Sequence, residues 1–249
     1  MVKKEIKNNT LLISLNRPEK RNSLHPDIVT ELKTSLINSE NDNEIRSIII
    51  TGEGSSFCAG ADLAYLEMLS DYSSIENEKD SMSLAELFLQ IYRFPKPIIA
   101  AVNGPAIAGG CGLASVCDIV VAHPELSKFG YSEVKIGFIP AIVSIFLLKR
   151  IGESHTRNML ITGETISGKR AYEIGFVNYL SENVLAESFN IAERINKNSA
   201  SSIIATKKMI EVISEIDLNT AIEFCINLNV ISRTTEDFKA GLQKFLTKD

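Results

Sequence analysis

Residues 96–118 read KPIIAAVNGPAIAGGCGLASVCD, and their pattern indicates the class of fold. The β-branched and small residues at 98–102 predict a buried strand, because short apolar runs bounded by turn residues are typical of strands covered on both faces. The Asn-Gly-Pro sequence at 103–105 predicts a tight loop. The small residues at 108–112 then predict the start of a buried helix. A strand, a loop and a helix in this order are typical of an α/β protein.

Composition and charge exclude several classes of protein. The uncharged run at 97–117 is 21 residues long, enough to span a bilayer, but its glycines and proline would interrupt a lipid-facing helix. The 249-residue chain is 45% hydrophobic and 23% charged, which is an ordinary globular composition. Its net charge is −5 and no stretch gathers Lys and Arg, so we expect neither a membrane nor nucleic acid as partner.

The cysteines and the N-terminus indicate a reducing compartment. Cys58, Cys111, Cys117 and Cys225 fit neither a disulfide framework nor a zinc-binding spacing, so we expect reduced thiols and no metal. The first ten residues turn polar where a signal peptide would need an apolar run. We therefore expect a cytoplasmic protein.

Strand-like and helix-like segments alternate up to about residue 140, and helices dominate after it. We expect strands at 3–7, 10–15, 45–51, 98–102 and 176–180, and helices starting at Pro26 and near Ala61 and covering 78–93, 140–151, 154–161, 167–174, 182–197, 199–214, 217–232 and 234–246. The polar, acidic run at 70–80 predicts a mobile loop. Helices without strands can bury their apolar faces only against the body or another subunit. Residues 1–190 are therefore expected to form one body, and residues 191–249 a helical oligomerisation region.

Two segments repeat the same order of strand, loop and small residues. The strand at 45–51 leads to residues 58–62 (CAGAD), and the strand at 98–102 leads to residues 108–111 (AGGC). The first N–H groups of a helix lack intrahelical acceptors and lie at the positive end of its dipole, and small residues let another molecule approach them. Two such helix starts that converge would form an oxyanion hole. The alternative is that the small residues only allow tight helix–sheet packing. The glycines form neither a G-x-G-x-x-G motif nor a P-loop.

A third segment, residues 129–140 (FGYSEVKIGFIP), places the carboxylate of Glu133 among apolar and small residues. Burial would raise the pKa of such a carboxyl group and suit it to general acid–base catalysis. The alternative is an exposed glutamate at the end of a strand. The residues alone leave both interpretations open.

In this order and at these spacings, the segments resemble the enoyl-CoA hydratase/isomerase (crotonase) superfamily. The matching stretches are 15–18 with Asn22 and Leu24, 57–63, 96–104, 108–110, 117–118, 129–130 with Glu133, Gly137 and Pro140, and 162–164 with Ala171 and 175–177. The resemblance covers nearly the whole chain. It implies an α/β fold, a crotonase-like spiral of ββα units with a C-terminal helical trimerisation region, assembled as a homotrimer or a dimer of trimers.

The resemblance also implies an acyl-CoA thioester as substrate, with no metal or redox cofactor. The thioester oxygen would accept hydrogen bonds from the N–H groups of Ala61 and Gly109, and Glu133 would be the catalytic acid and base. Hydratases of the family commonly place two glutamates around a water, at the positions of Gly112 and Glu133, so the first glutamate is missing here. We expect a hydratase that adds water across the 2,3 double bond of a 2-enoyl-CoA.

Two alternatives to the hydratase stay open. A single carboxylate can move a proton between C2 and C4, as in a 3-enoyl-CoA to 2-enoyl-CoA isomerase, and the missing glutamate also fits a non-catalytic acyl-CoA-binding subunit. A serine hydrolase has no support, because no G-x-S-x-G motif or Ser/His pair is present.

Further contacts follow from the resemblance. Substrate-binding positions are expected at Ala59, Gly60, Asp62, Leu63, Gly110, Gly112 and Ile142, and CoA contacts at Arg17, Lys20 and Arg21 and, from a neighbouring subunit, at Lys244 and Lys248. The alternative for the basic residues at 17–21 is a solvated charge cluster. We expect Asp62 and Asp118 to cap or anchor loops. The apolar residues between 142 and 146 predict either an acyl tunnel or a buried helix face.

Overall fold

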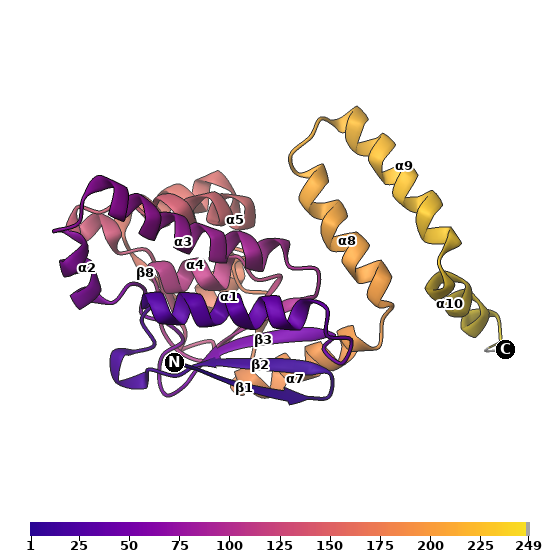
Figure 1. Cartoon of the computed structure of the whole chain (residues 1–249), viewed down its shortest axis with the longest axis horizontal. Helices are drawn as coiled ribbons and strands as arrows, with labels where there is room; N and C mark the ends of the chain where they lie inside the picture. Colours follow the sequence, from indigo (N-terminus) through magenta and orange to yellow (C-terminus); the bar gives the residue numbers. More distant parts are fainter. Residues whose placement is uncertain (248–249) are drawn as a thin grey trace.

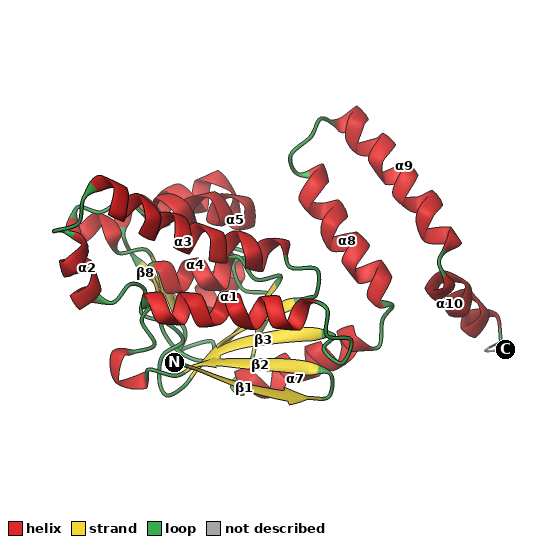
Figure 2. Ribbon diagram, viewed as in Figure 1, coloured by secondary structure: helices red, strands yellow, loops and turns green. Residues whose placement is uncertain are grey.

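A six-stranded sheet forms the centre of the computed structural model (Figures 1 and 2), which describes residues 1–247 without the side chains of Leu63 and Phe245. Lys248, one of the expected CoA contacts, lies outside the described residues. In spatial order the strands are β1 (Val2–Lys7), β2 (Thr10–Leu15), β3 (Ser47–Gly52), β4 (Ile98–Val102), β6 (Ile119–Ala122) and β9 (Tyr179–Leu180). β1 is an antiparallel edge strand, and all other neighbours in this sheet pair in parallel.

The strand β3 illustrates why this sequence forms a sheet covered on both faces. All six of its residues are buried. Ile48 and Ile50 belong to the main core, while Ile49 between them packs in a second core with α7 (Val184–Asn196). Successive side chains of a strand point to opposite faces, so a continuous apolar run fits a sheet between two layers. The helices of the main-core layer are α1 (Pro26–Glu40), α3 (Ser74–Arg93), α4 (Gly109–Ser115) and α5 (Ala141–Thr162).

A second, smaller sheet brings distant loops together. It contains β5 (Ala106–Ile107), β7 (Lys128–Gly130) and β8 (Thr165–Ser167). β5 and β7 pair in parallel, with Ala106 opposite Phe129, and an isolated parallel bridge adds Cys58 beside Ala106. Because parallel segments end at the same edge, the residues that follow these three positions leave the sheet side by side.

The helix α3 shows that the prediction of a loop at 70–80 was wrong from Ser74 onwards, whereas residues 70–73 do connect two helices. The helix begins at Ser74, and its N-terminus carries a capping box. The Ser73 hydroxyl accepts a hydrogen bond from the Glu76 N–H, and the Glu76 carboxylate accepts one from the Ser73 N–H at 2.9 Å. Acidic residues in the first turn also interact favourably with the helix dipole. Glu76, one of the charges that suggested a solvated loop, therefore stabilises a helix start.

Other differences from the sequence expectations concern short elements. The strands β5, β6, β7 and β8 were not predicted, and the strand expected at 176–180 contains only the two residues of β9. The helix expected near Ala61 is α2 (Leu63–Leu69), and the remaining short elements are α6 (Gly168–Glu173) and the 3-10 helices η1 (Pro18–Lys20) and η2 (Glu133–Ile136). The helices predicted at 140–151 and 154–161 form α5, interrupted by Gly152 with φ 72° and ψ 172°.

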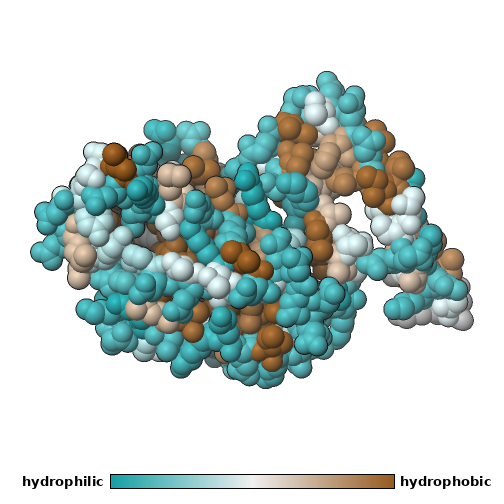
Figure 3. Space-filling view, viewed as in Figure 1, coloured by the Kyte–Doolittle hydropathy of each residue, from teal (hydrophilic) through white to brown (hydrophobic). Residues whose placement is uncertain are grey.

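Three C-terminal helices form an arm that extends away from the body (Figure 1). They are α8 (Ala200–Ile213), α9 (Leu218–Thr234) and α10 (Glu236–Leu246). Every residue of α8 and α9 is at least partly exposed, and apolar side chains are visible along the arm in Figure 3. The expected division between residues 190 and 191 falls inside α7, which packs on the sheet, so the arm starts at α8. Within residues 1–247, no helix is both long and apolar enough to cross a membrane.

Candidate active site

Three segments reach one place because their strands are aligned. The aligned residues are Cys58, Ala106 and Phe129. Ala61 and Gly109 each follow their aligned residue by three positions, and Glu133 follows its own by four. The first two loops touch, since an ideal Cβ on Gly60 would lie 3.4 Å from the Gly109 nitrogen. The Glu133 carboxylate lies close enough to the helix that begins at Gly109 for its charge to raise the pKa of Cys111 there. The structure thus brings together the three groups that the sequence singled out.

Glycine at position 60 allows the first two loops to approach closely. An ideal Cβ on Gly60 would lie 2.8 Å from the Ile107 carbonyl oxygen and 3.4 Å from the Gly109 nitrogen. Gly60 also has a φ of +85°, a conformation that side chains with a Cβ rarely adopt. Both the space and the backbone conformation therefore require glycine here.

The N–H groups of Ala61 and Gly109 are left free by the local pairing. Leu24 pairs with this loop through an isolated bridge. Its N–H donates to the Gly60 oxygen at 2.7 Å, and its oxygen accepts from the Asp62 N–H at 3.3 Å. The Ala61 N–H, which lies between these two groups, takes no part in the bridge. Gly109 is the first residue of α4, a position without an intrahelical acceptor. Among the hydrogen bonds of residues 1–247, neither N–H group has a protein acceptor. Two such donors at one edge can stabilise a negative oxygen.

Ala108 holds a strained backbone directly before one of these donors. Its φ is 51° and its ψ is −123°, which is unfavourable for a residue with a side chain. Its N–H donates to the Gly130 oxygen at 2.8 Å, and its own oxygen accepts from the Gly112 N–H at 3.0 Å. These two bonds hold the strained peptide in place and set the direction of the Gly109 N–H.

Glu133 begins the 3-10 helix η2 and carries a buried carboxylate. The residue is 8% exposed, and its Oε2 has no hydrogen-bond partner among the described residues. Burial raises the pKa of the Glu133 carboxyl group above its ordinary value. Its backbone oxygen accepts from the Phe138 N–H at 3.0 Å, which closes the turn after β7. An enclosed, unpartnered carboxylate of raised proton affinity is suited to accept and return a proton.

The space in front of Gly112 is filled by apolar side chains. An ideal Cβ at this position would lie 2.3 Å from Val143 Cγ1 and 3.2 Å from two ring atoms of Phe88. Val143 is 5% exposed and Phe88 is fully buried. No side chain at position 112 can therefore enter without displacing the core, and sequence reasoning did not identify Phe88 as the residue that blocks it.

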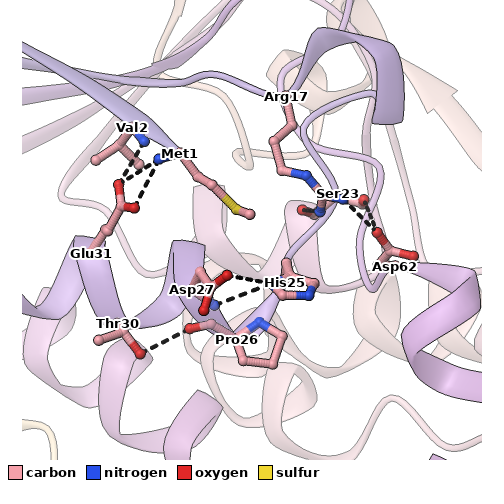
Figure 4. A network of polar contacts seen from close by, with 10 residues as sticks. All are labelled: Met1, Val2, Arg17, Ser23, His25, Pro26, Asp27, Thr30, Glu31 and Asp62. Atoms are coloured by element: carbon pink, nitrogen blue, oxygen red, sulfur yellow. Dashed lines mark hydrogen bonds and ion pairs between the residues drawn. The ribbon is translucent and has the colours of Figure 1, made fainter. Parts of the chain in front are cut away.

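Asp62 and Arg17 form an ion pair at the loop before α2 (Figure 4). Arg17 Nη2 donates to Asp62 Oδ2 at 3.0 Å, and Asp62 Oδ1 accepts from the Ala64 N–H at 3.1 Å as the cap of α2. Burial opposes ionisation of Asp62, but the bonds from Arg17 and Ala64 together lower its pKa. The Arg17 guanidinium is therefore engaged in an ion pair that anchors this loop. Lys20 and Arg21, the other two expected CoA contacts in this turn, are exposed.

The other expected substrate contacts differ in their surroundings. Ala59 is half-buried, and its N–H donates to the Arg21 oxygen at 3.0 Å. An ideal Cβ on Gly110 would lie only 2.1 Å from the Cys58 carbonyl oxygen, so the glycine lets the backbones of these two segments pack closely. Ile142 is half-buried against the main core. Leu63 is the first residue of α2, and Lys244 is exposed on the arm.

The cysteines near the site are unsuited to nucleophilic chemistry. Cys58 and Cys111 lie within three residues of Ala61 and Gly109 in the sequence, and both are buried, as is Cys117. Burial raises the pKa of each thiol to about 12, so the reactive thiolate is suppressed. Within residues 1–247, no three His, Cys, Asp or Glu side chains gather as metal ligands would.

Comparison with known proteins gives matches over almost the entire chain. A family model described as enoyl-CoA hydratase/isomerase matches residues 5–249. A protein of Thermus thermophilus, which is named provisionally as an enoyl-CoA hydratase, is 39% identical over 97% of this chain and 96% of its own length. The 2,3-dehydroadipyl-CoA hydratase of Escherichia coli is 32% identical over 96% of this chain and 92% of its own. The crystal structure of an enoyl-CoA hydratase from Polaromonas superposes with a TM-score of 0.95 at 30% identity, covering 99% of this chain and 97% of that one.

Proposed function

Because the chain belongs to the enoyl-CoA hydratase/isomerase family, we propose that it hydrates a 2-enoyl-CoA thioester across the 2,3 double bond. The observation that carries the proposal is the close approach of the loops that hold the free N–H groups of Ala61 and Gly109, together with the buried carboxylate of Glu133, whose charge acts on Cys111 in the helix that begins at Gly109. Relatives named enoyl-CoA hydratase or 2,3-dehydroadipyl-CoA hydratase support this class of reaction.

In the proposed reaction the thioester oxygen accepts hydrogen bonds from Ala61 and Gly109. When water adds at C3, electrons of the double bond move towards the thioester and leave negative charge on this oxygen. Donors already fixed at the place where charge develops need no reorganisation, and each contributes roughly 2.7–4 kcal/mol to catalysis in other enzymes. The strained backbone of Ala108 fixes the direction of the second donor, the Gly109 N–H.

Glu133 moves the proton in this scheme. Its carboxylate takes a proton from the attacking water while the water oxygen bonds to C3. The same carboxyl group then returns the proton to C2, so the product gains one hydroxyl group and one hydrogen. A pKa raised by burial brings the proton affinity of Glu133 closer to neutral pH, where one group can perform both steps.

A second candidate reaction is the isomerisation of a 3-enoyl-CoA to a 2-enoyl-CoA. It is favoured by the apolar side chains of Phe88 and Val143 in front of Gly112, which leave no space for a second acid there. One carboxylate suffices for this reaction, because Glu133 would take the proton from C2 and return it to C4. The oxyanion donors would act in the same way.

Purified protein offered both classes of substrate distinguishes these activities. With 2-enoyl-CoA esters of several chain lengths, and without added metal or redox cofactor, we expect loss of the conjugated thioester absorbance and a product heavier by one water. An isomerase would instead raise that absorbance from 3-enoyl-CoA without a change in mass. Binding of both esters without turnover would contradict the proposal and favour a non-catalytic acyl-CoA-binding subunit.

We propose that the arm joins copies of the chain into a homotrimer or a dimer of trimers. On α9 an apolar stripe recurs every four residues and is between 50% and 74% exposed, at Leu218, Ile222, Ile226 and Val230. A helix depends on burial of its apolar face, so this stripe requires a partner surface.

Placing a charge in the stripe is therefore expected to dissociate the assembly. Ile226→Asp should elute as a monomer in size-exclusion chromatography with light scattering, because a desolvated carboxylate opposes burial. The exposed neighbour Asn227 lies outside the stripe, and Asn227→Asp should leave the assembly intact. A wild-type protein that is already monomeric at micromolar concentration would contradict this proposal.

A further inference from the structure

A guanidinium group lies at the far end of the helix that carries Gly109. Arg150 Nη1 donates to two backbone carbonyl oxygens, that of Ser115, the last residue of α4, at 3.1 Å and that of Cys117, two residues beyond the helix, at 2.8 Å. Its Nε donates to the Phe176 carbonyl oxygen at 2.8 Å, and its Nη2 donates to Asn178 Oδ1 at 3.0 Å. All four acceptors are neutral.

The charge of Arg150 is not cancelled by a close acid. Among the described residues the guanidinium takes part in no ion pair within 4 Å, although Asp118 lies in the same region. That carboxylate accepts from the Ile98 N–H at 2.7 Å and pairs with Lys207. The positive charge of Arg150 therefore acts on neutral acceptors, among them the Ser115 carbonyl, which lies at the negative end of the α4 dipole.

The helix between Arg150 and the free N–H is short. α4 contains seven residues, with Gly109 first and Ser115 last. At about 1.5 Å per residue, its two ends are roughly 10 Å apart. Arg150 lies beyond the last carbonyl of this helix, so its charge is farther than this from the Gly109 N–H, and it still acts there where the effective dielectric constant is about 20.

We infer that Arg150 is a positioning residue for the oxyanion hole. It holds the Ser115 carbonyl at the C-terminus of α4 and the Cys117 carbonyl just beyond it, offsets the negative charge there and so strengthens the field at the Gly109 N–H. The inference rests on the proposed function, because it requires a thioester oxygen at Gly109. A residue that only stabilised the fold would lower the unfolding temperature without changing how strongly the bound carbonyl is polarised.

The test uses 4-(dimethylamino)cinnamoyl-CoA, a thioester whose absorption maximum moves to longer wavelength when its carbonyl group is polarised. The full-length wild type is compared with Arg150→Met, Arg150→Lys and the matched control Asn178→Ala. The control removes the Arg150 hydrogen bond to Asn178 but keeps the charge of Arg150 and its contacts to the Ser115 and Cys117 carbonyl oxygens. Each protein is saturated with the probe, and thermal unfolding checks that it is folded.

We expect equal shifts for wild type and Asn178→Ala, a clearly smaller shift for Arg150→Met, and an intermediate one for Arg150→Lys. With substrate, Arg150→Met should lower kcat roughly tenfold while KM changes by less than about twofold. A folded Arg150→Met with the wild-type shift overturns the inference.

If Arg150→Met does not fold, the probe shift of Arg150→Lys is compared with that of Asn178→Ala to test the inference. A smaller shift than that of Asn178→Ala supports the inference, and an equal shift overturns it. Wild type that binds the probe without any shift would overturn the proposed function itself, and the inference with it.

Discussion

Glutamine in place of Glu133 is expected to lower kcat for hydration roughly a thousandfold, because the variant can neither take the proton from water nor return it to C2. Gln has nearly the same shape, so KM should change little. Steady-state kinetics on a 2-enoyl-CoA measure both constants. The matched control is Glu125→Gln, which makes the same chemical change at an exposed position. Equal activity of Glu133→Gln and wild type would remove Glu133 from the mechanism.

The same variant should be more stable than wild type at neutral pH. Burial raises the pKa of Glu133 in the folded protein, so the ionised form is less favourable there than in the unfolded chain. The stability linked to this group is present below its ordinary pKa and is lost as pH rises through the raised value. The glutamine variant should therefore unfold at a higher temperature at pH 7, with the difference vanishing in acid. Wild-type kcat/KM should fall as pH drops through the same raised pKa of the free enzyme, since the carboxylate is the active form. A lower unfolding temperature for the variant at pH 7 would contradict this account of the site.

The long elements of the fold could be predicted from apolar periodicity, and the short ones could not. The run at 98–102 and the helix starting at Pro26 are both present as β4 and α1. β5 and β9 have only two residues each, too few for a period to be visible. Those short strands matter, since the pairing of Ala106 with Phe129 aligns the site. Tertiary pairing rather than local preference forms them.

The start of α3 shows the opposite case, because a local signal was present and was outweighed. Ser73 followed three residues later by Glu76 is a recognisable capping box. The acidic character of the same run indicated a loop instead. Capping and the helix dipole make Glu76 of this run a helix-stabilising group.

The identity of the oxyanion donors could be predicted only in part. The repeated Ala-Gly pattern pointed to Gly60 and Gly109, and the choice of Ala61 came from the family resemblance. The structure supplies the physical reason, since Leu24 uses the groups on either side of the Ala61 N–H. That bridge joins residues 37 positions apart, which no local pattern reveals. Arg150 was missed for the same reason, because its acceptors lie on other elements.

The missing acid at Gly112 was visible in the sequence, but the side chains that fill its place were not. Restoring the common pair of glutamates with Gly112→Glu is therefore expected to lower the free energy of unfolding by about 3–5 kcal/mol. The new Cβ would lie 2.3 Å from Val143 Cγ1, and the carboxylate would enter a space lined by Val143 and Phe88. Denaturant unfolding measures this loss, and hydration should not become faster. Gly112→Ala, which adds only the methyl group, should cost less.

A double-mutant cycle with Val143→Ala tests whether this contact is the cause. Removing the valine methyl groups opens the space that the Cβ at position 112 needs, although the truncation itself costs stability. Gly112→Glu with Val143→Ala should therefore be more stable than the sum of the single changes allows, by about 0.5–3 kcal/mol. Additive losses would show that Val143 does not exclude the second acid. A stable Gly112→Glu single variant with faster hydration would show that the site accommodates two glutamates, and would contradict a mechanism in which Glu133 alone moves the proton.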